Sequence, residues 1–268
     1  MTLFLHELKM NRISFLVWFV SVAALCGGCI FLFPMVEESM AETAEAFSAM
    51  GGFSSAFGMD KLSIATLEGF FGTEIGTIYA LGGGMFAAMT GIALLSKEEG
   101  GHTAEFLHTL PMGRISIVTS KLLAMVTIIT AFSLLNFGVF AGAIAILGEE
   151  VNMTSLTMYM LAQYLCQLET AAVCFALSAC LKRTQIGVGL GFALIMYVLD
   201  LVSRITSEME SLKYITPFYY ANATDIFRKR GRNQHYTRRD WNCNNHNRNR
   251  HCIYGLQQAR YRGINYFN

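Results

Sequence analysis

Five long apolar stretches constrain the fold of this chain more than any other feature of its sequence. They cover residues 13–34, about 75–95, about 117–147, about 156–180 and about 186–205. A helix needs about 20 mostly apolar residues to cross a bilayer, and 53% of this chain is hydrophobic while only 15% is charged. Soluble domains carry about a quarter charged residues. We therefore expect an all-α, polytopic membrane helical bundle with five spans.

The charges of the connecting segments predict which side of the membrane each segment faces. The first connection, residues 35–74, carries seven acidic residues against Lys61 alone, and the third contains Glu149 and Glu150. The other polar segments are basic, with Lys9, Arg12, Lys97, Arg114, Lys121, Lys182 and Arg183. Because cytoplasmic loops carry an excess of Lys and Arg, we expect the N-terminus and residues 96–121 in the cytoplasm and residues 35–70 outside.

Two amphipathic segments flank the first span. Residues 1–12, "MTLFLHELKMNR", predict a cytoplasmic interfacial helix in which Leu5 and Leu8 face lipid while Glu7 and Lys9 face water. Residues 35–70 predict an outer amphipathic helix that is broken at Gly51-Gly52. The membrane-spanning domain then covers residues 13–227, and Lys121 is expected to protrude or to snorkel toward the surface.

Residues 228–268 differ in composition from the rest of the chain. They contain ten Lys or Arg and one acid, Asp240. Since the whole chain has 20 basic and 19 acidic residues, the first 227 residues hold ten basic and 18 acidic ones. A basic nucleic-acid-binding arm and a metal site are two interpretations of this tail, the second resting on His235, Cys243, His246, His251 and Cys252. These five His and Cys residues lack the regular Cys-x-x-Cys pairing of structural zinc sites. We expect neither a metal nor a nucleic-acid partner.

A shifted reading frame is the third interpretation of the tail, and we favour it. Codons for Asn, His, Tyr and Asp all end in A followed by a pyrimidine, so a reading one base later turns them into Ile, Thr or Met codons. The tail is rich in these four residues, and its shifted reading is therefore apolar. As written, the tail is expected to be disordered.

We predict that the gene, read one base later from near codon 228, encodes a sixth apolar span with a basic end. The nucleotide sequence of the gene checks this prediction directly. The hypothesis is wrong if no apolar frame follows codon 227.

The charged segment between the second and third apolar stretches has the features of two short helices. Ser96 and Glu99 have the spacing of a capping box, and Thr103 could cap a second helix with Glu105 in its first turn. Phe106 and Leu110 share one face of that helix at i, i+4 spacing, and Pro111 ends it. This apolar ridge either packs under the protein's own bundle or docks into a groove of another protein.

The same segment, "EEGGHTAEFLHTLPMGRISIVTSK", resembles the first cytoplasmic loop of the membrane subunits of type-2 ABC transporters. The family pattern is an acidic pair, Gly or His, Thr, a Glu-Phe-Leu run, Pro, Arg, and Lys at the head of the next span. His108 departs from it, since a second Leu is common there. "HELK" near the N-terminus and "ITPFYYANATDI" at 215–226 also resemble the family, so the resemblance covers residues 1–227.

The resemblance implies a permease with six spans, both termini inside, and no ATPase of its own. ATP and Mg would bind to a separate ATP-binding subunit, and two permeases, identical or different, would pair in the lipid bilayer of a bacterial plasma membrane. The chain itself would hold no cofactor, metal or catalytic residue. Residues 96–116 would couple the partner's motion to the spans, through Glu98, Glu99, Thr103, Glu105, Phe106, Leu107, Leu110, Pro111 and Arg114.

Polar residues inside the apolar stretches are further candidates. Gln163, Gln167 and Glu169 lie in the fourth stretch, where buried polar groups are often functional and interhelical hydrogen bonding is an equally good interpretation. Asp200 and Arg204 have i, i+4 spacing and can pair with each other near the outer surface. The small residues in "ALGGGMFAAMTG" and "GVGLG" predict close helix contacts.

Two other classes of protein remain as alternatives. An intramembrane protease with an E-E-x-x-x-R motif would need Arg at position 103, which is Thr. The second alternative class is a membrane sensor or scaffold that transports nothing. A gene for an ATP-binding subunit next to this one would favour the permease.

Overall fold

A computed structural model describes residues 2–100, 113–149, 151–181, 185–205 and 207–228. The chain divides into two units, residues 1–227 and 228–268, and the predicted disorder of the tail concerns residues outside the described ones. The described residues form helices and turns but no strand, and five helical segments are long and apolar enough to cross a membrane. The prediction of a polytopic helical bundle with five spans is confirmed.

The first span belongs to a helix that is longer than a bilayer needs. Helix α1 (Thr2–Ser48) has 47 residues and continues through Pro34. Residues 2–12 and 35–48 are therefore continuous with the span, whereas separate amphipathic helices were predicted there. The predicted break at the glycine pair is confirmed, because α1 ends at Ser48, Gly51 has a φ of 57°, and α2 (Gly52–Phe57) begins after it.

The second span begins with α3 (Leu67–Phe70), capped by the Thr66 hydroxyl that accepts from the Gly69 N–H. It passes through a π-helical turn, η1 (Phe71–Ile75), into α4 (Gly76–Gly100). The remaining spans are α6 (Arg114–Leu147), α7 (Met153–Ser178) and α8 (Ile186–Ile205). Asn152 caps α7 by accepting from the backbone N–H groups of Thr154 and Ser155.

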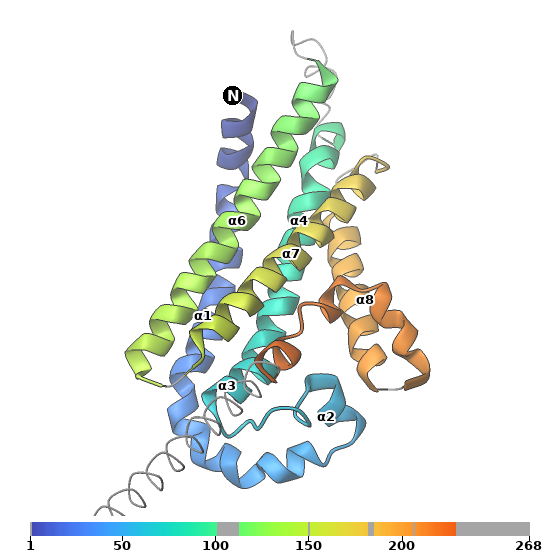
Figure 1. The fold of residues 1–268 in the computed structure, drawn as a ribbon. Coiled ribbons are helices and arrows are strands. Elements are labelled where there is room, and N and C mark those ends of the chain that lie inside the picture. The colour runs from blue at the N-terminus through green and yellow to red at the C-terminus, as the bar shows by residue number, and fades with distance from the viewer. Residues whose placement is uncertain (1, 101–112, 150, 182–184, 206, 229–268) are drawn as a thin grey trace, which may run out of the picture. The chain divides into compact units, whose positions relative to one another are not determined.

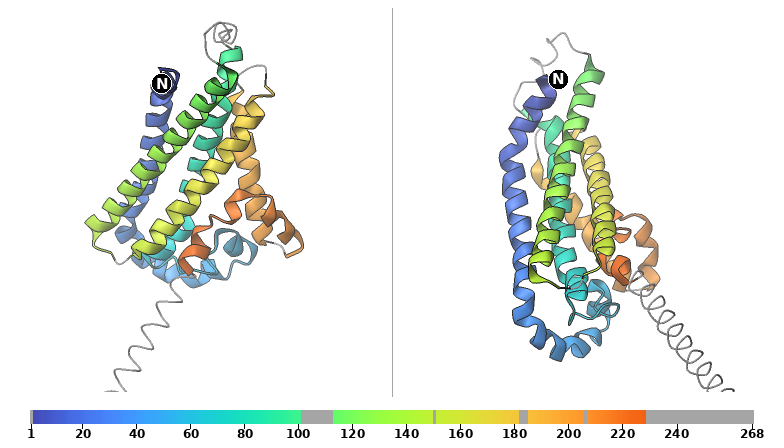
Figure 2. Two further views of the ribbon diagram at one scale, coloured as in Figure 1. Left: turned by 45° about the horizontal axis from the view of Figure 1, so that its top comes forward. Right: turned by 60° about the vertical axis from the view of Figure 1, so that its left-hand side comes forward.

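The spans associate mainly as two helix pairs. The most extensive contact is between α4 and α7, followed by that between α1 and α6, while α8 packs mainly on α4. Figures 1 and 2 show α1 beginning, α4 ending and α6 beginning at the same end of the bundle. We call this the connection end, because residues 101–113 join α4 to α6 there.

Small residues set the distance between α4 and its neighbours. A Cβ atom added to Gly91 would lie 2.4 Å from the Ala171 carbonyl oxygen of α7, and one added to Gly83 would lie 2.3 Å from Nε2 of Gln167. A Cβ on Gly189 of α8 would lie 3.0 Å from the Ala88 carbonyl oxygen. The predicted close helix contacts are confirmed, although Gly187 and Gly191 of "GVGLG" have no such neighbour within 4 Å.

Aromatic side chains fill the middle of the bundle. The ring of Phe86 on α4 stacks on that of Phe132 on α6 with centroids 4.5 Å apart, and Tyr79 meets Phe140 at 5.3 Å. The Tyr159 hydroxyl of α7 donates to the Gly76 carbonyl oxygen at 2.8 Å. These contacts join α4, α6 and α7 by burying large apolar area.

The end opposite to the connection end is built from short elements. They are α2, α3, two 3-10 helices, η2 (Ser207–Tyr214) and η3 (Pro217–Tyr219), and helical residues 223–228. Lys61 forms an ion pair of 3.0 Å with Asp225, in which both side chains are partly exposed. This end therefore brings residues 52–75 together with residues 207–227 (Figure 1).

Candidate functional site

The structure places both ends of the predicted coupling segment but describes little of its interior. Glu98 and Glu99 lie in the last turns of α4, and Arg114 is the first residue of α6, although only their backbone is described. The remaining predicted coupling residues lie outside the described residues: Thr103, Glu105, Phe106, Leu107, Leu110 and Pro111. Their roles in coupling stay predictions.

The predicted helix start at Ser96 is wrong, because α4 continues through this residue to Gly100. The Ser96 side chain is 1% exposed, and its hydroxyl donates to the Ile92 carbonyl one turn earlier. Its backbone N–H lies 3.2 Å from the Ser178 hydroxyl at the end of α7. Packing against α7 thus extends the span beyond the point where the sequence suggested a new cap.

A buried ion pair lies inside the connection end. The Lys121 ammonium on α6 donates to Oε1 of Glu7 on α1 at 2.7 Å and to the Leu94 carbonyl oxygen of α4 at 2.7 Å. The two charged side chains are 0% and 1% exposed. The predictions that Glu7 faces water and that Lys121 protrudes or snorkels are therefore wrong, because each charge is neutralised inside the protein.

This ion pair fixes three helices at one point. Breaking a buried pair by removing one of its members costs about 3–5 kcal/mol. A charged hydrogen bond to a backbone carbonyl adds directionality. Because Glu7, Leu94 and Lys121 belong to α1, α4 and α6, the arrangement defines how these helices meet beside the connection.

The three polar residues predicted for the fourth stretch have different environments. Gln167 is buried and its Oε1 accepts from the Ser133 hydroxyl of α6 at 3.1 Å, while Gln163 donates to the Ala221 carbonyl oxygen at 2.9 Å. Glu169 lies on the exposed face of α7. The structure thus gives Gln167 an interhelical hydrogen bond, gives Gln163 a hydrogen bond to the turn after η3, and leaves Glu169 apart from them.

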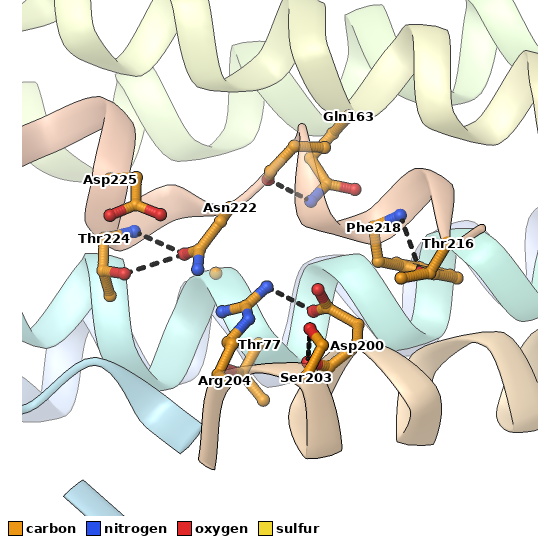
Figure 3. Close-up of polar contacts among 12 residues, drawn as sticks. Thr77, Gln163, Asp200, Ser203, Arg204, Thr216, Phe218, Asn222, Thr224 and Asp225 are labelled. Carbon is orange, nitrogen blue, oxygen red and sulfur yellow. Dashed lines mark hydrogen bonds and ion pairs between the residues drawn. The ribbon is translucent and has the colours of Figure 1, made fainter. Parts of the chain in front are cut away.

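A polar cluster lies where α8 meets the segment around η3 (Figure 3). Arg204 donates through Nη2 to Oδ2 of Asp200, so the predicted i, i+4 pairing is confirmed, and Asp200 is 1% exposed. On the facing segment, the Asn222 side chain accepts from both the backbone and the hydroxyl of Thr224. Beside this cluster, the Gln163–Ala221 hydrogen bond ties the irregular chain around η3 to α7.

A small cavity of about 20 Å³ adjoins this cluster and is lined by Gln163, Asp200, Arg204 and Asn222 among others. Three polar atoms in its lining have no protein partner among the described residues: Oε1 of Gln163, Oδ1 of Asp200 and Nε of Arg204. The volume suits one water molecule. Among the described residues, no group of three or more His, Cys, Asp or Glu side chains is placed to hold a metal ion.

The fold and these polar contacts define a class of protein. Five apolar helices packed through small residues, with charged and amide side chains hydrogen-bonded between helices, make a multi-pass membrane protein. The sequence model of one family, described as ABC-2 family transporter protein, matches residues 1–237. The chain belongs to this family, as its resemblance to type-2 ABC permeases indicated. Searches of the curated proteins and of the solved structures gave no match.

Membership of this family makes the chain a permease, the membrane subunit of an ABC transporter, and not itself a catalytic subunit. For Glu7 and Lys121, at the connection end, the environment predicted from the sequence was wrong. Both lie next to apolar runs, a signal that predicts either a snorkelling side chain or a buried pair. The choice between the two depends on contacts between residues 114 positions apart.

Proposed function

We propose that the chain is the permease subunit of an ATP-driven exporter in the bacterial plasma membrane. ATP is hydrolysed on a separate ATP-binding subunit, and the connection between α4 and α6 docks on that subunit from the cytoplasm. A second permease, identical or different, completes the pathway. The match of residues 1–237 to the ABC-2 transporter family is the observation that carries this proposal.

The position of the connection supports its proposed coupling role. Residues 101–113 join α4 to α6, and α4 has the most extensive contacts of all the spans, with α7 and α8. Gly83 and Gly91 let α4 pack closely against α7. A displacement of the end of α4 would therefore reach α7 and α8 directly.

The apolar ridge of the connection is the proposed anchor in the partner's groove. Phe106, Leu107 and Leu110 are large apolar residues in an otherwise polar segment, and buried aromatic anchors carry much of the free energy of an interface. The acidic pair Glu98 and Glu99 and the basic Arg114 flank this ridge in sequence. They would set the register of docking rather than its affinity.

We expect Phe106→Asp to prevent association with the ATP-binding subunit. A lost aromatic anchor costs at least about 2 kcal/mol, which is more than a tenfold loss of affinity. The measurement is co-purification of the two subunits from membranes, together with the stimulation of ATP hydrolysis by the permease. Phe53→Asp is the matched control, since Phe53 is 50% exposed on α2 at the opposite end.

Equal association of the Phe106→Asp and wild-type chains would refute the docking assignment. Association without any stimulation of ATP hydrolysis by the wild-type chain would favour the sensor or scaffold instead. The control variant is expected to bind and stimulate as the wild type does.

A further inference from the structure

The two helix pairs of the bundle contact each other less extensively than the helices within each pair do. The contacts between the pairs, of α6 with α7 and of α4 with α1 and α6, are each much less extensive than those within the α1–α6 and α4–α7 pairs. Among the described ring contacts between the pairs, those of Phe86 on α4 with Phe15, Trp18 and Phe132 lie nearest to the connection end. Phe86 lies eight residues before Leu94, or about 12 Å along the helix.

The Lys121 ammonium bridges the two pairs beyond this aromatic contact. Its hydrogen bond to Glu7 lies within the α1–α6 pair, and its hydrogen bond to the Leu94 carbonyl reaches across to α4. Leu94 and Met125 also belong to one small apolar cluster, but apolar packing lets surfaces slide whereas a charged hydrogen bond fixes two atoms. The pairs are also joined farther into the bundle by the Ser133–Gln167 and Thr130–Tyr164 hydrogen bonds between α6 and α7, so Lys121 fixes their register at the connection end.

The bridge lies close to both ends of the connection. Leu94 is six residues before the end of α4 at Gly100, and Lys121 is seven residues after the start of α6 at Arg114. These distances correspond to roughly 9 and 10 Å along the helices. A displacement of the connection therefore reaches the bridge through less than about two turns of helix on either side.

We propose that Lys121 is a positioning residue that holds the α1–α6 and α4–α7 pairs together, so that displacement of the connection moves both pairs as one body. Glu7 orients the ammonium within the α1–α6 pair by accepting its hydrogen bond. The coupling part of this proposal rests on the proposed function, whereas the holding of the two pairs can be measured on the permease alone.

The buried ion pair is not needed for stability alone. A buried ion pair replaced by apolar residues of similar volume is often neutral or stabilising. The double variant Glu7→Met/Lys121→Met is therefore expected to fold, while losing the directional bond to the Leu94 carbonyl. Such a variant separates the positioning role of Lys121 from its contribution to stability.

The test measures distances between spin labels on the full-length chain with its native cysteines replaced. Labels at Leu5 of α1 and Leu177 of α7, which are 57% and 38% exposed, report the separation of the two pairs at the connection end. Labels at Leu5 and Ile115 report the separation within the α1–α6 pair. We expect the double variant to lose the narrow 5–177 distribution and to keep the 5–115 distribution.

An unchanged 5–177 distribution in the double variant would overturn the proposal, whether or not an ATP-binding subunit associates. Loss of both distributions would also overturn it, because the pair would then hold α1 in place rather than join the two pairs. With the partner present, the double variant is expected to associate as the wild type does while losing stimulated ATP hydrolysis.

Retained stimulation in the double variant would refute the coupling role of Lys121. Failure of the wild-type chain to associate would refute the proposed function and leave the distance result standing. Lys61→Met/Asp225→Met removes the exposed ion pair at the opposite end, and this control is expected to change neither distances nor stimulation.

Discussion

Replacing Gly91 with Ala is expected to destabilise the folded permease, although Ala is the better helix former. The added Cβ would lie 2.4 Å from the Ala171 carbonyl oxygen and 3.1 Å from Cβ of Cys174. The nearest atom belongs to the backbone of α7, so no side-chain rotation relieves the contact and the two helices must move apart. Such overpacking costs about 1–3 kcal/mol, sometimes more, and it opens the most extensive helix contact of the bundle.

Gly142→Ala in α6 is the matched control for this substitution. Nothing lies within 4 Å of the position that its Cβ would occupy, so the gain in helix propensity, up to about 1 kcal/mol, is unopposed. The midpoint of thermal unfolding in detergent, followed by size-exclusion chromatography, should therefore fall for Gly91→Ala and stay or rise for Gly142→Ala. Equal midpoints would show that α4 and α7 are not as close as the structure places them.

The same contact shows what the sequence could predict about this fold. Long apolar runs located the spans, and the small residues of the second run indicated a close helix contact. The partner of that contact was not predictable, because apolar runs of similar composition give no sign of which two helices pair. The ends of the spans were misplaced for a related reason: α4 continues past Ser96 because that residue packs against Ser178 of α7.

The sequence predicted the partner of a charged residue only where the two residues lie close together in the chain. The i, i+4 spacing of Asp200 and Arg204 lies within one helix, so their pairing followed from local geometry. Glu7 and Lys121 are 114 positions apart, and each had a good local alternative at the membrane surface. The partners of Gln163 and Gln167, on the segment around η3 and on α6, likewise depend on the tertiary arrangement.

The polar cluster around Asp200 depends on a single buried carboxylate, and its removal is expected to have a large effect. Asp200→Ala leaves the Arg204 guanidinium, whose side chain is only 12% exposed, without its carboxylate partner. An uncompensated buried charge costs about 3–5 kcal/mol. We expect the lower part of this range, because Arg204 lies one residue from the end of α8 and retains some access to water.

Asp225→Ala gives the same chemical change in an exposed ion pair and serves as the control. The Lys61 and Asp225 side chains are 24% and 34% exposed, and pairs of this kind contribute about 0–1 kcal/mol. The thermal midpoint should therefore fall clearly for Asp200→Ala and little for Asp225→Ala. Similar midpoints would mean that Arg204 reaches solvent when it loses Asp200.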